Sequence, residues 1–154
     1  MSPDRPRLSL AVQYGIASAT LPAPAALRRW ARAAAERDAI VTLRFVGNHE
    51  GRTLNARYRG KDHATNVLAF VYDDASPLSG DLVLCAPVLR QEAKAQRKAL
   101  ADHCAHLVVH GMLHLQGYGH DTGRAARSME ARETTILAAL GVPDPYARPG
   151  DTRR

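Results

Sequence analysis

The sequence predicts a single α+β domain, in which about four strands form one mixed sheet packed with four or five helices. Segments whose apolar residues alternate with a period of two are interleaved with segments that repeat at helical spacing. A length of 154 residues suits one domain, here 1–154, with a buried core. A segment from about residue 101 is apolar nearly all round, which predicts a central, buried helix.

In the first half of the chain, apolar residues alternate over 8–14 and 41–45 and predict two strands. Between these strands, apolar residues recur at helical spacing over 27–34, as in an amphipathic helix. A short helix follows over 48–58, with Asn48 as its expected N-cap.

In the second half, the continuous apolar run 67–72 predicts a strand buried on both faces. A further strand is expected over 82–86, and Pro87 suits the first turn of a helix that continues through Lys98. A last helix follows Gly123 and ends at Gly141. The tail, 144–154, is polar, contains proline and is expected to be flexible.

A formal net charge of +6 suits a polyanionic partner, although a basic surface without a partner is the alternative. Cys85 and Cys104 stand far apart and are expected to be buried small hydrophobic residues. The N-terminus has no signal-peptide pattern, and no apolar run is long enough to span a membrane. We therefore expect a soluble, cytoplasmic protein without a membrane partner.

Three histidines in the central segment have the spacing of metal ligands. His110 and His114 are four residues apart, which places both imidazoles on one face of a helix. Gly117 allows the helix to end in a left-handed conformation, so that the chain can bring His120 back towards them. Three imidazoles can hold a tetrahedral metal ion with water in the fourth position. They suit zinc, but copper, nickel and iron(II) also accept nitrogen ligands.

Two further histidines, His103 and His106, lie on the same face of the predicted helix as His110 and His114. We expect His103, beside Asp102, to be a satisfied core histidine or a surface residue, whereas His106 either lines a pocket or packs in the core. The spacing HxxxHxxGxxH is that of metzincin-type zinc sites and raises a protease hypothesis. Those enzymes carry a glutamate directly after the first histidine as general base. Here Gly111 stands in that place and has no group to accept a proton.

Two blocks carry a resemblance to a known family. Residues 110–120 read HGMLHLQGYGH and resemble the HGxLHLxGYDH signature of the YbeY family. Residues 54–70 read LNARYRGKDHATNVLAF and are similar to the LNxxYRxKDxxT(D/N)VLSF block of that family. The resemblance covers about residues 40–141. Gly119 stands where the family usually has an aspartate, and Asp121 follows the last histidine instead.

The resemblance implies a bacterial, single-strand-specific metallo-endoribonuclease with a zincin-like metal site on the central helix. It implies one Zn²⁺ per chain, held by His110, His114 and His120, and Arg59 as the catalytic residue that stabilises phosphoryl oxygens. The alternative for Arg59 is an ordinary surface arginine. The implied roles are 3′-end maturation of 16S rRNA and late-stage ribosome quality control. The expected partners are single-stranded RNA, small-subunit rRNA and the ribosome or its small-subunit proteins, and no DNA is expected.

Four more residues are candidates for contact with substrate or with the metal ligands. Lys61 or its neighbours are expected to contact the RNA backbone. Asp62 and Asp81 are candidates for binding a water or orienting a ligand histidine, and the alternative for each is a helix or turn cap. Asp121 is the candidate to replace the aspartate that Gly119 lacks.

Two other functions remain open from the sequence. One is a different metallohydrolase, a protease or amidase, on the same three histidines, which Gly111 opposes. The other is a non-catalytic RNA- or ribosome-binding factor in which zinc is structural.

Overall fold

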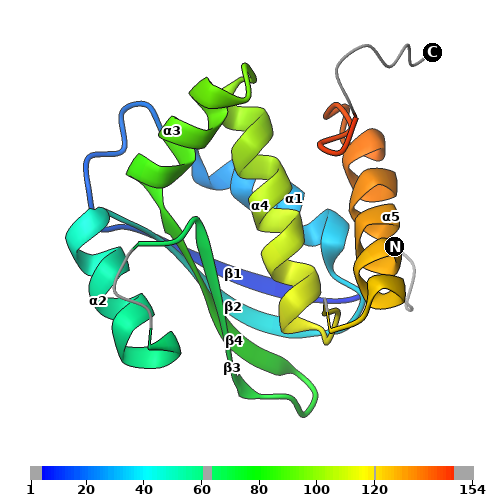
Figure 1. Ribbon diagram of the computed structural model, residues 1–154. Helices are drawn as coiled ribbons and strands as arrows, with labels where there is room; N and C mark the ends of the chain where they lie inside the picture. The colour runs from blue at the N-terminus through cyan, green and yellow to red at the C-terminus, as the bar shows by residue number, and fades with distance from the viewer. Residues whose placement is uncertain (1–4, 61–63, 120, 148–154) are drawn as a thin grey trace.

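The computed structural model describes residues 5–60, 64–119 and 121–147, so most of the tail predicted to be flexible lies outside the described residues. It confirms one α+β domain with a four-stranded mixed sheet and five helices (Figure 1). The elements are β1 (Leu8–Tyr14), α1 (Pro24–Ala34), β2 (Ala39–Val46), α2 (Asn48–Arg59), β3 (Val67–Asp73), β4 (Leu78–Cys85), α3 (Ala86–Ala95), α4 (Leu100–Leu115) and α5 (Gly123–Ala139).

The sheet has the strand order β1-β2-β4-β3. β1 pairs with β2 and β2 with β4 in parallel, whereas β3 runs antiparallel to β4. Figure 1 shows α4 lying across the sheet, with α5 beside it and α2 at the other side of the molecule. This arrangement makes α4 the element that meets both the sheet and the C-terminal helix.

β3 differs from the prediction, because it is an edge strand and is not buried on both faces along its length. Leu68 is buried beside Leu54 of α2, and Val67 packs against the core on the α4 side. Val71 and Tyr72, however, are 46% and 69% exposed. The apolar run therefore reflects helices on both sides of the strand's first half and not a central position in the sheet.

α4 is buried as predicted, since it packs on the sheet and contacts α1, α3 and α5. Gly111 lies on the side of α4 that faces the sheet. A Cβ atom at this position would stand 2.7 Å from Leu82 Cδ2, so glycine permits the close approach of α4 to β4.

Three smaller expectations have mixed outcomes. α2 begins at Asn48 with Gly47 as its cap, so the cap prediction is wrong by one residue. The helix after β4 ends at Ala95 and does not continue through Lys98. Both cysteines are buried and free, as predicted. None of the helices in the described ranges is both long and apolar enough to cross a bilayer.

Candidate metal centre

Two of the three predicted ligand histidines meet on α4. The Nε2 atoms of His110 and His114 lie 3.1 Å apart. Nitrogen ligands about 2.0–2.1 Å from a tetrahedral zinc ion stand about 3.3–3.4 Å from each other. The two imidazoles are therefore spaced nearly as a shared metal ion would hold them.

The other ring nitrogens fix the tautomers of both histidines. His110 Nδ1 lies 2.6 Å from Oε2 of Glu133, and His114 Nδ1 lies 3.0 Å from the backbone carbonyl of Tyr118. A carboxylate and a carbonyl only accept hydrogen bonds, so each Nδ1 carries the proton and donates it. Each imidazole then directs its Nε2 atom towards the other ring. Two imidazole nitrogens presented to one place are a donor set that fits a metal ion.

Hydrogen bonds hold the segment 116–118 after α4 in place and so position the Tyr118 carbonyl, the hydrogen-bond partner of His114. Gly117 adopts a positive φ of 103°, which glycine tolerates and which turns the chain out of the helix. Gln116 Nε2 donates to the carbonyl of Ala34 at 2.9 Å, and the Tyr118 hydroxyl donates to Glu36 at 3.0 Å. The carbonyl of Tyr118 is thereby held beneath His114.

Glu133 of α5 is fully buried and joins three side chains. Its carboxylate accepts hydrogen bonds from His106 Nε2 at 3.0 Å, from His110 Nδ1 and from the Tyr146 hydroxyl. Burial alone raises the pKa of Glu133, but the hydrogen bonds from His106, His110 and Tyr146 outweigh it and lower the pKa to about 2. Burial and the carboxylate of Glu133 raise the pKa of Tyr146. Glu133 is therefore an anion that accepts hydrogen bonds from all three neighbours.

His106, His110 and Glu133 offer ligand atoms within 4.8 Å of one another, and this group could hold a metal ion. The contacts inside the group also have hydrogen-bond lengths, and the 2.6 Å between His110 and Glu133 is shorter than the usual spacing of two zinc ligands. We therefore interpret Glu133 as the carboxylate that orients His110, in the carboxylate–histidine arrangement common around metal ions. His106, one helical turn before His110, donates to the same carboxylate, and this contact gives it a structural role.

His103 is a core histidine, as one of the two expected roles has it, but only one of its two ring nitrogens has a hydrogen-bond partner among the described residues. It is 3% exposed, and its Nε2 lies 2.8 Å from Oε1 of Glu92 in α3. Burial lowers the pKa of His103 despite this hydrogen bond. The ring is therefore neutral near pH 7 and donates from Nε2.

The remaining predicted site residues are not all gathered at the histidines. Lys61, Asp62 and His120 lie outside the described residues. Arg59 is the exposed last residue of α2. Asp81 lies inside β4, where it accepts a hydrogen bond from the Tyr72 hydroxyl.

Asp81 is directed to the face of the sheet opposite α4, because its neighbours Gly80 and Leu82 face that helix. The structure therefore supports neither the prediction that Asp81 orients a ligand histidine nor the alternative that it caps a helix or turn. Asp121 is exposed, and its Oδ2 lies 4.0 Å from where a Cβ atom of residue 119 would stand. Its carboxylate thus lies next to the position of the aspartate that Gly119 lacks.

Glu133 and Tyr146 are site residues without a role predicted from the sequence. A signal for Glu133 is present, because the carboxylate occupies the apolar stripe of α5 between Met129 and Leu137. A glutamate in such a stripe needs a buried partner. Tyr146 follows the last helix within a polar segment and carries no comparable signal.

Comparison with known proteins adds a family. A model described as Endoribonuclease YbeY matches residues 23–141, a longer stretch than the resemblance in the two motif blocks. A protein named Endoribonuclease YbeY from Aromatoleum aromaticum is 56% identical over 144 residues, which cover 92% of this chain and 94% of that protein. The protein of the same name from Cupriavidus metallidurans is 53% identical over 146 residues, which cover 92% of this chain and 74% of that protein.

Among solved structures, the solution structure of TM1509 from Thermotoga maritima is similar, with a TM-score of 0.57. The match covers 93% of this chain and 99% of that chain at 20% sequence identity. At this identity the likeness concerns the fold alone.

Proposed function

The chain belongs to the endoribonuclease YbeY family, and from this premise we propose that it is a zinc-dependent endoribonuclease that hydrolyses phosphodiester bonds in single-stranded RNA. Its substrate in the cell is the 3′ end of 16S rRNA, and its role extends to late-stage ribosome quality control. Its partners are small-subunit rRNA and small-subunit ribosomal proteins in the cytoplasm. Relatives at 56% and 53% identity that carry the name endoribonuclease support the activity.

The observation that carries the proposal is the convergence of the His110 and His114 Nε2 atoms at 3.1 Å, each with its Nδ1 proton fixed by an acceptor. His110, His114 and His120 hold one zinc ion per chain in this proposal. Bound there, zinc supplies a Lewis acid and lowers the pKa of a coordinated water to about 7. Glu133 keeps His110 in the tautomer that presents Nε2.

Arg59 acts on the phosphate. Its guanidinium is always charged, planar and able to donate two parallel hydrogen bonds to phosphoryl oxygens. As an exposed residue at the end of α2, it is accessible to a bound strand. In the transition state the phosphoryl oxygens gain negative charge, and Arg59 stabilises that charge. Lys61 contacts the RNA backbone, and Asp121 takes the place of the aspartate absent at Gly119.

The proposal is tested with metal analysis and two substrates. Protein purified without added metal is expected to carry about one zinc per chain, which falls sharply in His114→Ala. The wild-type protein is expected to cleave labelled single-stranded RNA and to leave casein intact, and Arg59→Ala is expected to bind RNA normally but to cleave it slowly. Cleavage that survives both chelation and Arg59→Ala arises from a contaminant and contradicts the proposal.

A protease or amidase at the same histidines is disfavoured by packing as well as by sequence. A side chain at position 111 points towards Leu82 of the sheet, so a glutamate there would meet the core and not the histidines. RNA binding without cleavage by the zinc-loaded protein would instead favour the non-catalytic ribosome-binding factor.

A further inference from the structure

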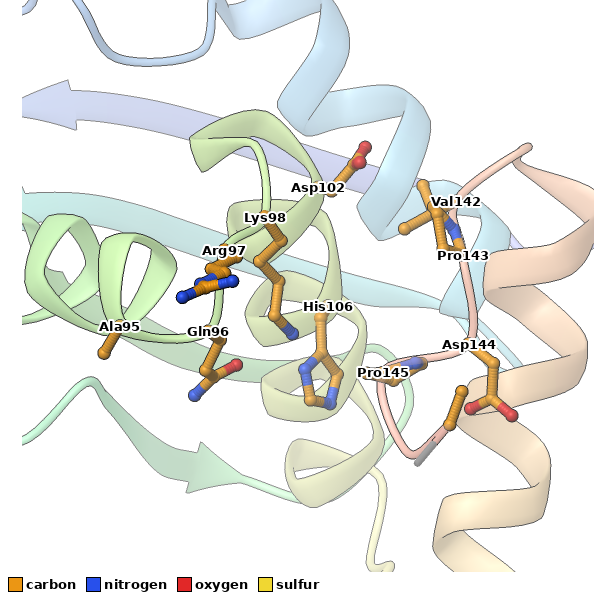
Figure 2. A pocket seen from close by; sticks show the side chains of 11 residues that line it. Ala95, Gln96, Arg97, Lys98, Asp102, His106, Val142, Pro143, Asp144 and Pro145 are labelled. Atoms are coloured by element: carbon orange, nitrogen blue, oxygen red, sulfur yellow. The ribbon is translucent and has the colours of Figure 1, made fainter. Parts of the chain in front are cut away.

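Two hollows meet beside the histidine cluster. The larger, of about 670 Å³, lies between the α3–α4 turn and the segment after α5 (Figure 2). The smaller, of about 320 Å³, reaches His110. Both are lined by Gln96, Lys98, His106 and Pro145. A continuous groove therefore leads from the candidate metal centre to the α3–α4 turn, and its larger part has the volume of a small-molecule site.

Lys98 is the cationic side chain that lines both hollows. It is half-buried, and Figure 2 shows its side chain extending towards His106. Glu92 lies near it, but the carboxylate of Glu92 already accepts hydrogen bonds from Asn66 and His103. Asp102 also lies near it, but among the described residues the ammonium group makes no hydrogen bond or ion pair, so it is available to an anionic ligand in the groove.

Arg97 precedes Lys98 and has a strained backbone. Its φ of 54° lies in the left-handed region, which residues with a Cβ atom rarely adopt outside functional sites and tight turns. This conformation follows the end of α3 and places Arg97 and Lys98 consecutively along the groove. The sequence thus keeps an arginine where glycine would relieve the strain.

Acidic groups line each of the two hollows, but none lines both, and Glu92 lines the smaller one. Asp102 and Asp144 line the larger hollow and not the smaller one. Asp144 accepts hydrogen bonds from Thr134 and from the backbone amide of Tyr146, so part of its charge is already compensated. The overlap of the two hollows, where Lys98 and His106 stand, is thus the most favourable place for an anion.

We propose that this groove is a phosphate subsite of the RNA strand, in which Lys98, with Arg97 at its outer side, binds the backbone phosphate of the nucleotide next to the scissile bond. The inference rests on the proposed function, because single-stranded RNA at His110 has to extend from the cluster along one of its open sides. The groove begins at His110 and carries the cations that a backbone phosphate requires. It positions the substrate and takes no part in the chemical step.

The test is the salt dependence of RNA binding, measured by fluorescence anisotropy with a labelled, phosphorothioate-linked oligouridine that resists cleavage. Each phosphate contact to a single strand contributes about 0.7 to the slope of log K against log salt concentration. Lys98→Gln is expected to lower the slope by about 0.7, and Lys98→Arg is expected to restore it. Lys94→Gln is the matched control, because it removes the same charge from an exposed position on α3 that lines neither hollow.

Arg97→Gly separates a binding role from a structural one. Relief of the backbone strain is expected to raise the thermal midpoint by about 2–4 °C, while affinity for the oligouridine falls. A variant that is more stable and binds as tightly as wild type would show that Arg97 does not bind the strand.

Equal slopes for Lys98→Gln and Lys94→Gln, with both proteins folded, would overturn the subsite. So would a Lys98→Arg variant that fails to restore the slope. Absence of RNA cleavage by the wild-type protein would contradict the proposed function instead, and the anisotropy slopes would still decide whether Lys98 binds a phosphate.

Discussion

His103 and His110 lie on the same face of α4, and each contacts a carboxylate, but the two histidine–carboxylate pairs differ in the structure. His103 pairs with Glu92 of α3 at 2.8 Å, and His110 pairs with Glu133 of α5 at 2.6 Å. Glu92 contacts Nε2 of His103, whereas Glu133 contacts Nδ1 of His110. In the first pair, Nε2 of His103 is hydrogen-bonded within the protein, to Glu92. In the second pair, Nε2 of His110 is directed at Nε2 of His114.

The difference shows that helical spacing alone does not assign a role to a histidine. The Nδ1 atom of His103 is buried without a hydrogen-bond partner in the described part of the chain, so this ring offers nothing to a ligand. His106 has the same arrangement, with Nε2 bonded to Glu133 and Nδ1 buried. The ring nitrogen that contacts a protein acceptor therefore divides these histidines into two groups. His103 and His106 use Nε2 and are structural, whereas His110 and His114 use Nδ1 and are candidate ligands.

The largest difference is expected when His110 and His103 are each replaced by alanine. His110→Ala is expected to reduce bound zinc from about one per chain to almost none, because a ligand is lost. His103→Ala is expected to keep its zinc and to lose only stability, since its ring faces Glu92. Metal analysis of both variants by atomic emission, with circular dichroism as the folding control, measures the difference. Equal zinc contents in the two variants would remove the distinction.

The next test exchanges the carboxylates. Glu133→Gln is expected to weaken zinc affinity about 10–100-fold, the usual cost of losing an outer carboxylate that orients a ligand histidine. Glu92→Gln is the matched control and is expected to leave the affinity unchanged. Competition with a fluorescent zinc chelator gives both values. A weaker affinity in Glu92→Gln than in Glu133→Gln would reverse the assignment of the two pairs.

The pKa of Glu133 makes a third prediction, for the metal-free protein in acid. Its hydrogen bonds lower the pKa in the folded state to about 2 from an ordinary 4.5, so its stabilising effect is fully present above about pH 4.5. This contribution disappears as the pH falls from about 4.5 to about 2. Urea unfolding at a series of pH values is expected to show the loss in wild type and Glu92→Gln, and a flatter profile in Glu133→Gln. The same slope in all three proteins would argue against the low pKa.

Much of this architecture follows from local pattern. The alternation in 8–14 and the helical repeat in 27–34 predict their elements because one face of each is buried and the other is wet. The apolar run of β3 misleads because burial of a strand also depends on which helices cover it. Its place at the sheet edge is decided by pairing across the chain, which the run itself does not encode.

The histidine cluster was predictable in the same limited way. The spacing of His110 and His114 is local and survives in the structure. Glu133, by contrast, lies 23 residues away on another helix, and its contact with His110 depends on how α5 packs against α4. The choice between Nδ1 and Nε2 depends on that packing too, so no pattern within α4 distinguishes His103 from His110.

The smallest expected difference in zinc affinity concerns the side chain that donates a further hydrogen bond to each carboxylate. The Tyr146 hydroxyl donates to Glu133, and Asn66 Nδ2 donates to Glu92 at 3.2 Å. Tyr146→Phe is expected to cost about 1 kcal/mol of stability and to weaken zinc affinity only a few-fold, because His106 and His110 still hold the carboxylate. Asn66→Ala is expected to cost a similar free energy without changing zinc affinity, since Glu92 does not reach a ligand histidine. Urea unfolding and chelator competition together measure both. If Asn66→Ala alters zinc affinity as much as Tyr146→Phe does, the two carboxylates belong to one network and the separation of these histidines into two groups does not hold.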